Sequence, residues 1–191
     1  MPNRTHPHTA FHLERRIAHG RLSEVAVGVK HAGVETPVLV FDDVTGKQVD
    51  LDTRGTDDEV RARYSPPPEP PRGRGRPKLG VVPREVTLLP RHWEWLNKQP
   101  GGASNALRKL VDSARHESGA ELRAQTRAAH EAAYHFMHAI AGDFPGYEEA
   151  TRALFANDHK LFAQLIAHWP HDISAHAVNL AFGASSHRDA P

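Results

Sequence analysis

The 191-residue sequence contains no cysteine. This absence excludes disulfide bonds, iron–sulfur clusters, cysteine-rich zinc sites and thiol nucleophiles. Long hydrophobic runs are also missing, and an apolar stretch such as residues 36–41 is far shorter than the roughly 20 residues of a membrane-spanning helix. The first residues lack the apolar stretch of a secretory signal. We therefore expect a cytoplasmic protein with no membrane association.

Common enzyme motifs are absent as well. The sequence has no Walker-type phosphate loop, no Gly-x-Gly-x-x-Gly after a strand, no Gly-x-Ser-x-Gly elbow and no recognisable triad spacing. No pattern in it points to a bound cofactor. We therefore expect a protein that is not an enzyme and that carries no cofactor.

What the sequence does contain is a segregated charge distribution. The net charge is only +1, but residues 72–115 hold ten Lys and Arg against three Asp and Glu, a local charge of +7. Residues 1–64 carry a charge of −1 and residues 116–191 carry −4. A basic band of this kind favours a polyanionic partner, although an acidic region of the protein itself would explain it too.

A proline-rich tract divides the chain. Five of the seven residues from 65 to 71 are proline, and because proline lacks an amide donor and has a fixed φ, this tract favours an extended spacer. The patterns on either side predict a mostly helical α+β protein. Its expected segments are a small α+β domain (1–64), a Pro-rich and then basic linker (65–83), a strand–helix–helix module (84–117), a C-terminal helical region (118–182) and a tail (183–191).

The strands of the N-terminal domain follow from its β-branched and aromatic residues. Residues 37–42 predict a strand, and the alternating residues 48–52 predict its return strand. Residues 11–20 fit either a strand or a short arm. The carboxylates around the expected turn, Asp42, Asp43, Asp50 and Asp52, are interpreted as solubilising residues rather than as a cation site.

Two helices are expected in the same domain. Residues 22–31 have helical periodicity, with Ser23 at the N-cap position. Thr56 and Glu59 form a capping-box pattern that opens a short helix ending at residue 64.

Residues 84–117 combine a short strand over residues 84–89, a short helix, a glycine turn and a helix capped by Ser104. This order resembles a ribbon-helix-helix module, in which two chains pair their single strands into one ribbon and so form a homodimer. In that fold the ribbon enters the major groove of DNA, and the start of the second helix meets a phosphate. The resemblance implies DNA contacts from Arg84, Val86, Leu88, Ser104 and Asn105.

The register of this strand decides which side chains reach DNA. In one register Arg84, Val86 and Leu88 point to the DNA. A shift by one residue points Glu85 there instead. Neither register gives a strongly polar reading surface, so the alternative is a strand–helix–helix segment that belongs to a larger core.

Residues 74–77 read Arg-Gly-Arg-Pro and resemble the core of an AT-hook. In such a segment glycine allows a close approach to DNA, proline keeps the backbone extended, and arginine lies in a narrow A·T-rich minor groove. The resemblance implies DNA contacts from Arg72, Arg74, Arg76 and Lys78. The alternative is a solvated linker with incidental charge.

Histidine is abundant in residues 116–191, where nine of the 15 histidines lie. The helices expected there span residues 121–141, 148–155, 160–168 and 170–182. On the first of them, His130, His135 and His138 have spacings that can place two metal ligands on one face. No His-Glu-x-x-His motif completes such a site, so we expect surface or core histidines and no bound metal.

Four strings carry a closer resemblance: residues 37–52, 75–82, 84–93 and 99–104. They resemble a bacterial family known only as domain of unknown function 2239, and the resemblance extends from residue 11 to residue 180. It implies a bacterial source and supplies no reaction, ligand or site.

Together these patterns favour a homodimeric DNA-binding protein, a transcription regulator that uses the basic linker and the ribbon-helix-helix-like module. The alternative is a non-enzymatic protein–protein interaction or assembly factor whose basic band meets an acidic protein. A third interpretation is a histidine-based metal or ligand binder in the C-terminal helices.

Overall fold

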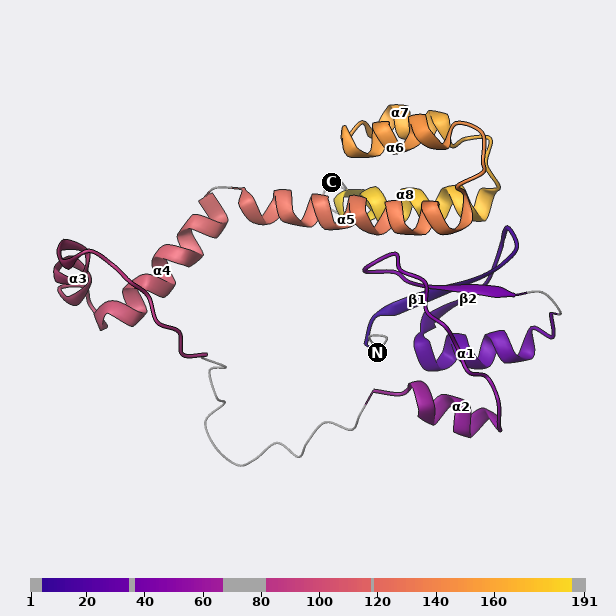
Figure 1. Ribbon diagram of the computed structural model, residues 1–191, viewed down its shortest axis with the longest axis horizontal. Coiled ribbons are helices and arrows are strands. Elements are labelled where there is room, and N and C mark those ends of the chain that lie inside the picture. The colour runs from indigo at the N-terminus through magenta and orange to yellow at the C-terminus, as the bar shows by residue number, and fades with distance from the viewer. Residues whose placement is uncertain (1–4, 35–36, 67–81, 118, 187–191) are drawn as a thin grey trace. The chain divides into compact units, whose positions relative to one another are not determined.

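The computed structural model describes residues 5–34, 37–66, 82–117 and 119–186. These residues form eight helices and one three-stranded sheet (Figure 1), which confirms the expected mostly helical α+β fold. The chain divides into two compact units. Unit 1 combines Met1–Pro67 with Gln125–Pro191, and unit 2 is Pro68–Ala124.

Unit 1 is built on an antiparallel sheet of three short strands. The strands are β1 (Pro7–His12), β2 (Arg15–Arg21) and β3 (Val38–Asp42), in the order β2-β1-β3. β1 and β2 form a hairpin whose register shifts between Ala10 and Phe11, which marks a β-bulge. The expected strand over residues 37–42 is confirmed, and the segment 11–20 contains the hairpin turn and most of β2.

Two helices lie on one side of the sheet. They are α1 (Leu22–His31), which packs on the strands, and α2 (Asp57–Tyr64), which packs on α1. The capping box of α2 is confirmed: the Glu59 N–H donates to Thr56 Oγ1, and the Thr56 N–H donates to the Glu59 carboxylate at 2.7 Å. The expected N-cap at Ser23 is wrong, because α1 begins one residue earlier at the fully buried Leu22.

The expected return strand over residues 48–52 is wrong. Among the described residues, only a single bridge between Phe41 and Gln48 extends the sheet at this edge. Val49 and Leu51 pack against the buried apolar residues of α1 and α2. Next to this bridge, the Val49 N–H donates to the carbonyl oxygen of Val40 at 2.7 Å. The alternation of polar and apolar residues therefore reflects an extended segment that pairs with β3 only at its start and packs on the helices.

The opposite face of the sheet carries helices from the C-terminal part of the chain. They are α5 (Ala120–Ile140) and α8 (His171–Ser186), with α6 (Tyr147–Phe155) and α7 (His159–Leu165) packed beyond them (Figure 1). These four helices match the expected ones. Their buried residues share one core with Phe11 and Phe41 of the sheet, so the segments 1–64 and 118–182, expected as separate, pack together.

Three phenylalanines connect the sheet to α5. The ring centroids of Phe41 and Phe136 are 4.9 Å apart, and those of Phe11 and Phe136 are 5.4 Å apart. All three side chains are fully buried. Aromatic pairs in such edge-on or tilted arrangements add about 0.5–1.5 kcal/mol to the stabilisation from burial alone.

The turn after β3 also lies directly against α5. Gly46 has a φ of +66°, and a Cβ at this position would lie 1.8 Å from the carbonyl oxygen of Ala132. Only glycine combines this backbone conformation with so close an approach. The backbone of the turn and the backbone of the helix are therefore in contact.

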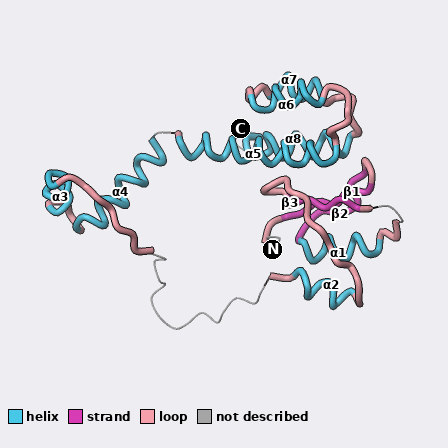
Figure 2. The backbone as a smooth tube through the Cα atoms, viewed as in Figure 1, coloured by secondary structure: helices cyan, strands magenta, loops and turns pink. Residues whose placement is uncertain are grey.

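Unit 2 contains two helices, α3 (Pro90–Asn97) and α4 (Gly102–Glu117). Proline suits the first position of α3, because the N–H it lacks would have no partner within the helix. The expected strand over residues 84–89 is not formed, and residues 82–89 are a loop (Figure 2). A strand needs a neighbour for its backbone N–H and C=O groups, and the described part of a single chain provides none here.

Replacing Phe136 with alanine tests the core of unit 1. We expect the free energy of unfolding to fall by about 3–5 kcal/mol, because the change removes a fully buried ring from between the sheet and α8. Urea denaturation followed by circular dichroism measures this. Phe155→Ala is the control, since that ring is half exposed on α6. Equal losses from the two variants would contradict the assignment.

Candidate nucleic-acid interface

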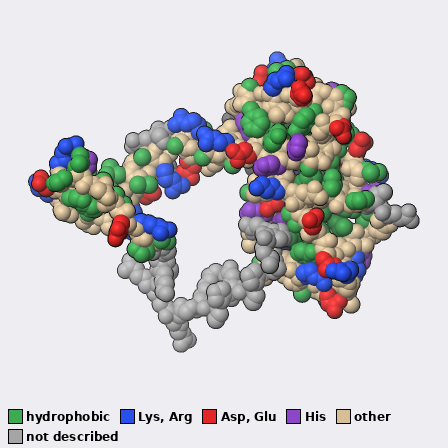
Figure 3. All heavy atoms as spheres, in the orientation of Figure 1, with side chains coloured by type: hydrophobic (Ala, Val, Ile, Leu, Met, Phe, Trp, Pro, Cys, Tyr) green, Lys and Arg blue, Asp and Glu red, His purple; other side chains and the backbone are tan. Residues whose placement is uncertain are grey.

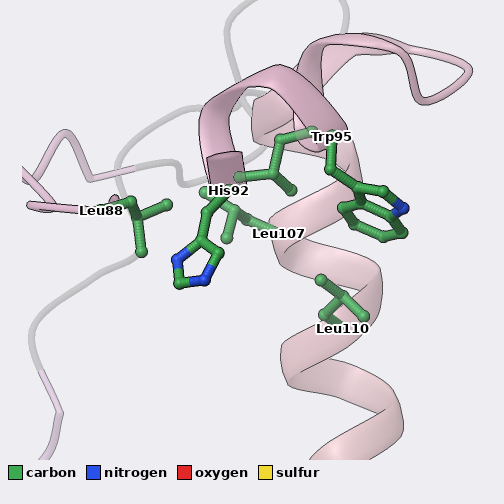
Figure 4. A pocket seen from close by; sticks show the side chains of 6 residues that line it. Leu88, His92, Trp95, Leu107 and Leu110 are labelled. Atoms are coloured by element: carbon green, nitrogen blue, oxygen red, sulfur yellow. The ribbon is translucent and has the colours of Figure 1, made fainter. Parts of the chain in front are cut away.

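Unit 2 carries an apolar groove between its two helices and the loop that precedes them (Figure 4). Helical spacing brings Trp95 of α3 onto the same face as His92, and Leu110 of α4 onto the same face as Leu107. The groove has a volume of about 280 Å³, and the residues that line it are Leu88, His92, Trp95, Leu96, Leu107 and Leu110.

The apolar side chains of unit 2 are mostly in contact with solvent. Among its described residues only Leu96 and Ala106 are buried hydrophobics. The large exposed ones are Val82, Val86, Leu89, Trp93, Trp95, Leu110, Val111 and Leu122, and Figure 3 shows hydrophobic side chains on the surface around α3. Exposed apolar patches of this kind mark interaction sites in soluble proteins. Unit 2 therefore presents an uncovered apolar face.

The same segment also carries exposed cationic side chains. The exposed ones on residues 82–117 are Arg84, Arg91, Lys98, Arg108, Lys109 and Arg115. Arg115 pairs with Glu121 at 2.8 Å, and Arg108 Nε donates to the carbonyl oxygen of Ser104. Within the described part of the chain the other four form no ion pair, so their charges are available to an anionic partner.

The residues expected on the strand take different positions. Arg84 and Val86 are exposed in the loop. Leu88 lines the groove between the helices, whereas the register that points Arg84 and Val86 to DNA predicted Leu88 on the DNA side as well. Of the expected AT-hook residues, Arg72, Arg74, Arg76 and Lys78 lie outside the described residues.

The expected cap of the second helix is wrong. α4 begins at Gly102, two residues before Ser104, so Ser104 lies in the first turn of the helix. The Asn105 side-chain amide donates to the carbonyl oxygen of Pro100 at 3.4 Å. Both residues nevertheless lie at the start of α4, where the helix dipole favours an anion.

No sequence pattern indicated the polar cluster around Asp43 in unit 1, in which Thr9 and His176 are buried and His19 is exposed. Thr9 Oγ1 donates to Asp43 Oδ2 at 2.9 Å and lies 3.0 Å from His19 Nδ1. Asp43 Oδ1 lies 3.4 Å from Nε2 of the buried His176, a contact without hydrogen-bond geometry. Thr9 and His19 lie on neighbouring strands, but Asp43 after β3 and His176 on α8 are distant from them in sequence, so no local spacing could reveal the cluster. The Asp43 carboxylate therefore lies between the imidazoles of His19 and His176, at 3.3 Å and 3.4 Å.

The neighbouring Asp42 is also buried rather than solubilising. Its carboxylate lies 2.9 Å from His6 Nδ1 and accepts hydrogen bonds from the N–H groups of Val44 and Thr45. Burial raises the pKa of Asp42, but the hydrogen bonds from His6 and from the two backbone N–H groups together outweigh it, and the pKa lies below its usual value. The negative charge of Asp42 is therefore stabilised in the folded state.

The three histidines considered as metal ligands have separate partners. His130 is buried against the rings of Phe155 and Phe182. His135 Nδ1 lies 3.1 Å from the carbonyl oxygen of Thr45, and His138 Nδ1 lies 3.3 Å from the hydroxyl of Tyr147. Within the described ranges, no group of three or more His, Asp or Glu side chains is arranged to hold a metal ion.

Comparison with known proteins identifies a family. A family model described as an uncharacterised protein conserved in bacteria, DUF2239, matches residues 7–181. No curated protein and no solved structure matches the chain. None of the described helices has both the length and the apolar composition needed to cross a membrane.

Asp42→Asn tests the polar end of the sheet. Because the pKa of Asp42 is lowered in the folded state, its contribution to stability is present above its ordinary value of 3.8 and is lost as the pH falls through the lower folded value. We expect the wild-type free energy of unfolding to fall with acid in this range, and the variant to show a shallower fall. Urea denaturation between pH 5 and pH 2 measures both, and parallel curves would refute the assignment.

Proposed function

Because the matching family model spans residues 7–181, the chain belongs to DUF2239, a family of uncharacterised proteins conserved in bacteria, and from this premise we propose that it is a homodimeric DNA-binding protein. In this proposal it acts in the cytoplasm as a transcription regulator. Residues 82–117 of unit 2 and the basic linker before them supply the contacts to DNA, and residues 82–117 also pair the two chains.

The observation that carries the proposal is the combination of surfaces on unit 2. An apolar groove and several exposed apolar side chains lie beside cations that have no ion-pair partner within the described residues. An apolar face needs a cover, and free cations favour an anion. A dimer on DNA satisfies both requirements at once.

The occupant of the apolar face is a second copy of the same unit. Residues 82–89 run without a neighbouring strand, and an antiparallel copy of the same segment would supply partners for their N–H and C=O groups. In such a dimer the small cores around Leu96 and Ala106 of the two copies would join into one larger core. Pairing of this kind is isologous, so each groove receives the same residues from its partner.

The cations of unit 2 continue the charge of the linker. Arg84, Arg91, Lys98 and Lys109 add to Arg72, Arg74, Arg76 and Lys78, and in a dimer each set occurs twice. Protein cations replace condensed counterions on DNA, so such a set provides most of the affinity for a duplex. Arg-Gly-Arg-Pro at residues 74–77 would add a preference for narrow A·T-rich minor grooves.

A second candidate function is supported by the tryptophans of α3. Trp93 and Trp95 are exposed on the helix, and tryptophan and arginine are the residues that dominate binding energy in protein–protein interfaces. An acidic protein would then occupy the apolar face and the cations together. This makes the chain an assembly factor instead of a regulator.

Dimerisation is tested by variants of the two elements that would pair. We expect a wild-type dimer in light scattering, and a monomer for Val86→Pro, because proline removes a donor from a central pair of strands. Val86→Thr keeps the N–H and is the matched control. Leu110→Ala should weaken the dimer by about 2–5 kcal/mol if the second copy buries it fully.

Leu161→Ala controls for the second variant, because Leu161 on α7 of unit 1 is exposed to a similar extent, 43% against 48% for Leu110. It should leave the dimer intact. A wild-type monomer over the micromolar range would rule out pairing through unit 2.

DNA binding is tested by its salt dependence. The logarithm of affinity falls with the logarithm of salt concentration by about 0.9 per phosphate contact. Replacing Arg72, Arg74, Arg76 and Lys78 with alanine should therefore flatten the slope by up to roughly 3–4 per chain. Arg84→Ala should also alter sequence preference, since Arg84 would lie on the ribbon. Fluorescence anisotropy with A·T-rich and G·C-rich duplexes measures both effects.

The control for the linker variant removes the same charge from unit 1, where Arg15, Lys47, Arg61 and Lys160 are all exposed. Their replacement by alanine should leave the slope unchanged. Equal effects of the two quadruple variants would show a response to net charge only. No binding near 50 mM salt, where non-specific contacts are strong, would favour the protein-partner alternative.

A further inference from the structure

The corner of unit 1 where α5 meets the end of α8 contains a buried histidine that no interaction with DNA would use. His130 of α5 is 5% exposed. Its ring centroid lies 5.6 Å from that of Phe182 on α8 and 6.4 Å from that of Phe155 on α6. The imidazole therefore lies among aromatic rings contributed by two other helices.

One of its ring nitrogens is buried without a polar partner. This atom is Nε2, and the side chain of Asn157 is the hydrogen-bonding group that acts on the pKa of the imidazole. Asn157 lies between α6 and α7 with a φ of +56°, a left-handed conformation that asparagine tolerates better than most residues. His130 therefore connects α5 to the α6–α7 connection as well as to α8.

The neutral imidazole suits this site and the charged one does not. In the neutral form the single N–H can donate to Asn157, and the unpaired Nε2 is only an acceptor. Protonation adds a second N–H, at Nε2, which would be a charged donor without an acceptor. Burying such a group costs far more than burying a neutral acceptor. Burial is also the main reason that the pKa of His130 lies below its usual value.

The groups that face His130 do not offset this charge. On α7, His159 stacks on Phe182 at 4.4 Å and supplies no negative charge. Asp158 precedes it and accepts from the Leu161 N–H at the start of α7. The rings that α6 and α8 contribute, Phe155 and Phe182, carry no charge. No carboxylate on these facing elements contributes to the pKa of His130.

We propose that His130 makes the packing of this corner pH-dependent. The neutral imidazole holds the end of α8 and the α6–α7 connection against α5, and protonation of the imidazole releases them. This pH dependence is independent of DNA binding. The sign follows from the preference for the neutral form. Stability is full above the ordinary histidine value of about 6.5 and is lost as the pH falls toward the lower folded value, because the unfolded chain binds the proton first.

The test compares His130→Gln with wild type. Glutamine keeps an amide that can bond to Asn157 and has no charged form. Over the pH range in which the unfolded histidine titrates, the wild-type equilibrium constant for unfolding should rise by up to tenfold more per pH unit than that of the variant. Other buried histidines, such as His8 and His176, act equally in both proteins. Urea denaturation from pH 7.5 to pH 5 gives these constants.

His138→Gln is the matched control, since His138 is exposed on the same helix. The unfolding constant of this variant should have the same pH dependence as that of the wild type. Hydrogen exchange of the wild type at pH 5.5 and pH 7.5 locates the opening, which should appear first at residues 155–159 and in the last turns of α8. A proton NMR titration of the His130 ring in the folded wild type provides a readout without any substitution. Parallel pH curves for wild type and His130→Gln, uniform exchange over unit 1, or a ring that titrates at or above the ordinary value would each overturn the proposal.

Discussion

Contact between the phenylalanines of the sheet and Phe136 of α5 is the interaction on which unit 1 depends. Three strands of five to seven residues cannot form a stable sheet in water without a packed face. α1 covers one face, and the buried rings of Phe11 and Phe41 require a cover on the other. Because that cover comes from residues after 125, unit 1 cannot close until both parts of the chain are present, and unit 2 is an insertion between them.

The sequence predicted those elements whose cause is local. The helical period of residues 22–31 and the capping box at Thr56 are decided by neighbours three or four residues away, and both are found in the structure. Residues 48–52 were mispredicted because an alternating pattern shows only that one side of an extended segment is covered, and here helices cover it. Residues 84–89 have no neighbouring strand within the described part of the chain, and so they form a loop there.

The polar groups of unit 1 were the least predictable part of the candidate sites. The cluster around Asp43 joins β1, β2, the end of β3 and α8, and only tertiary structure brings these elements together. Within the described residues, the buried side-chain atoms without a partner belong to His8, Asp43, His130, Thr151 and His176. Three of the five are imidazoles, which can stay neutral and so bear burial at lower cost than a carboxylate or an amine. The basic band of unit 2 was visible because charge, unlike a tertiary contact, is a property of composition.

The insertion of unit 2 also determines when unit 1 can fold during translation. Phe41 leaves the ribosome well before Phe136, and at about 5–20 residues per second the intervening 95 residues take roughly 5–20 seconds to make. During that interval the strands present an apolar face with no helix to cover it, and closing so long a loop slows folding further. A chaperone that shields extended apolar segments would have its longest opportunity on residues 7–42. The N-terminal strands, although they are synthesised first, are thus among the last parts of the chain to be packed in the folded structure.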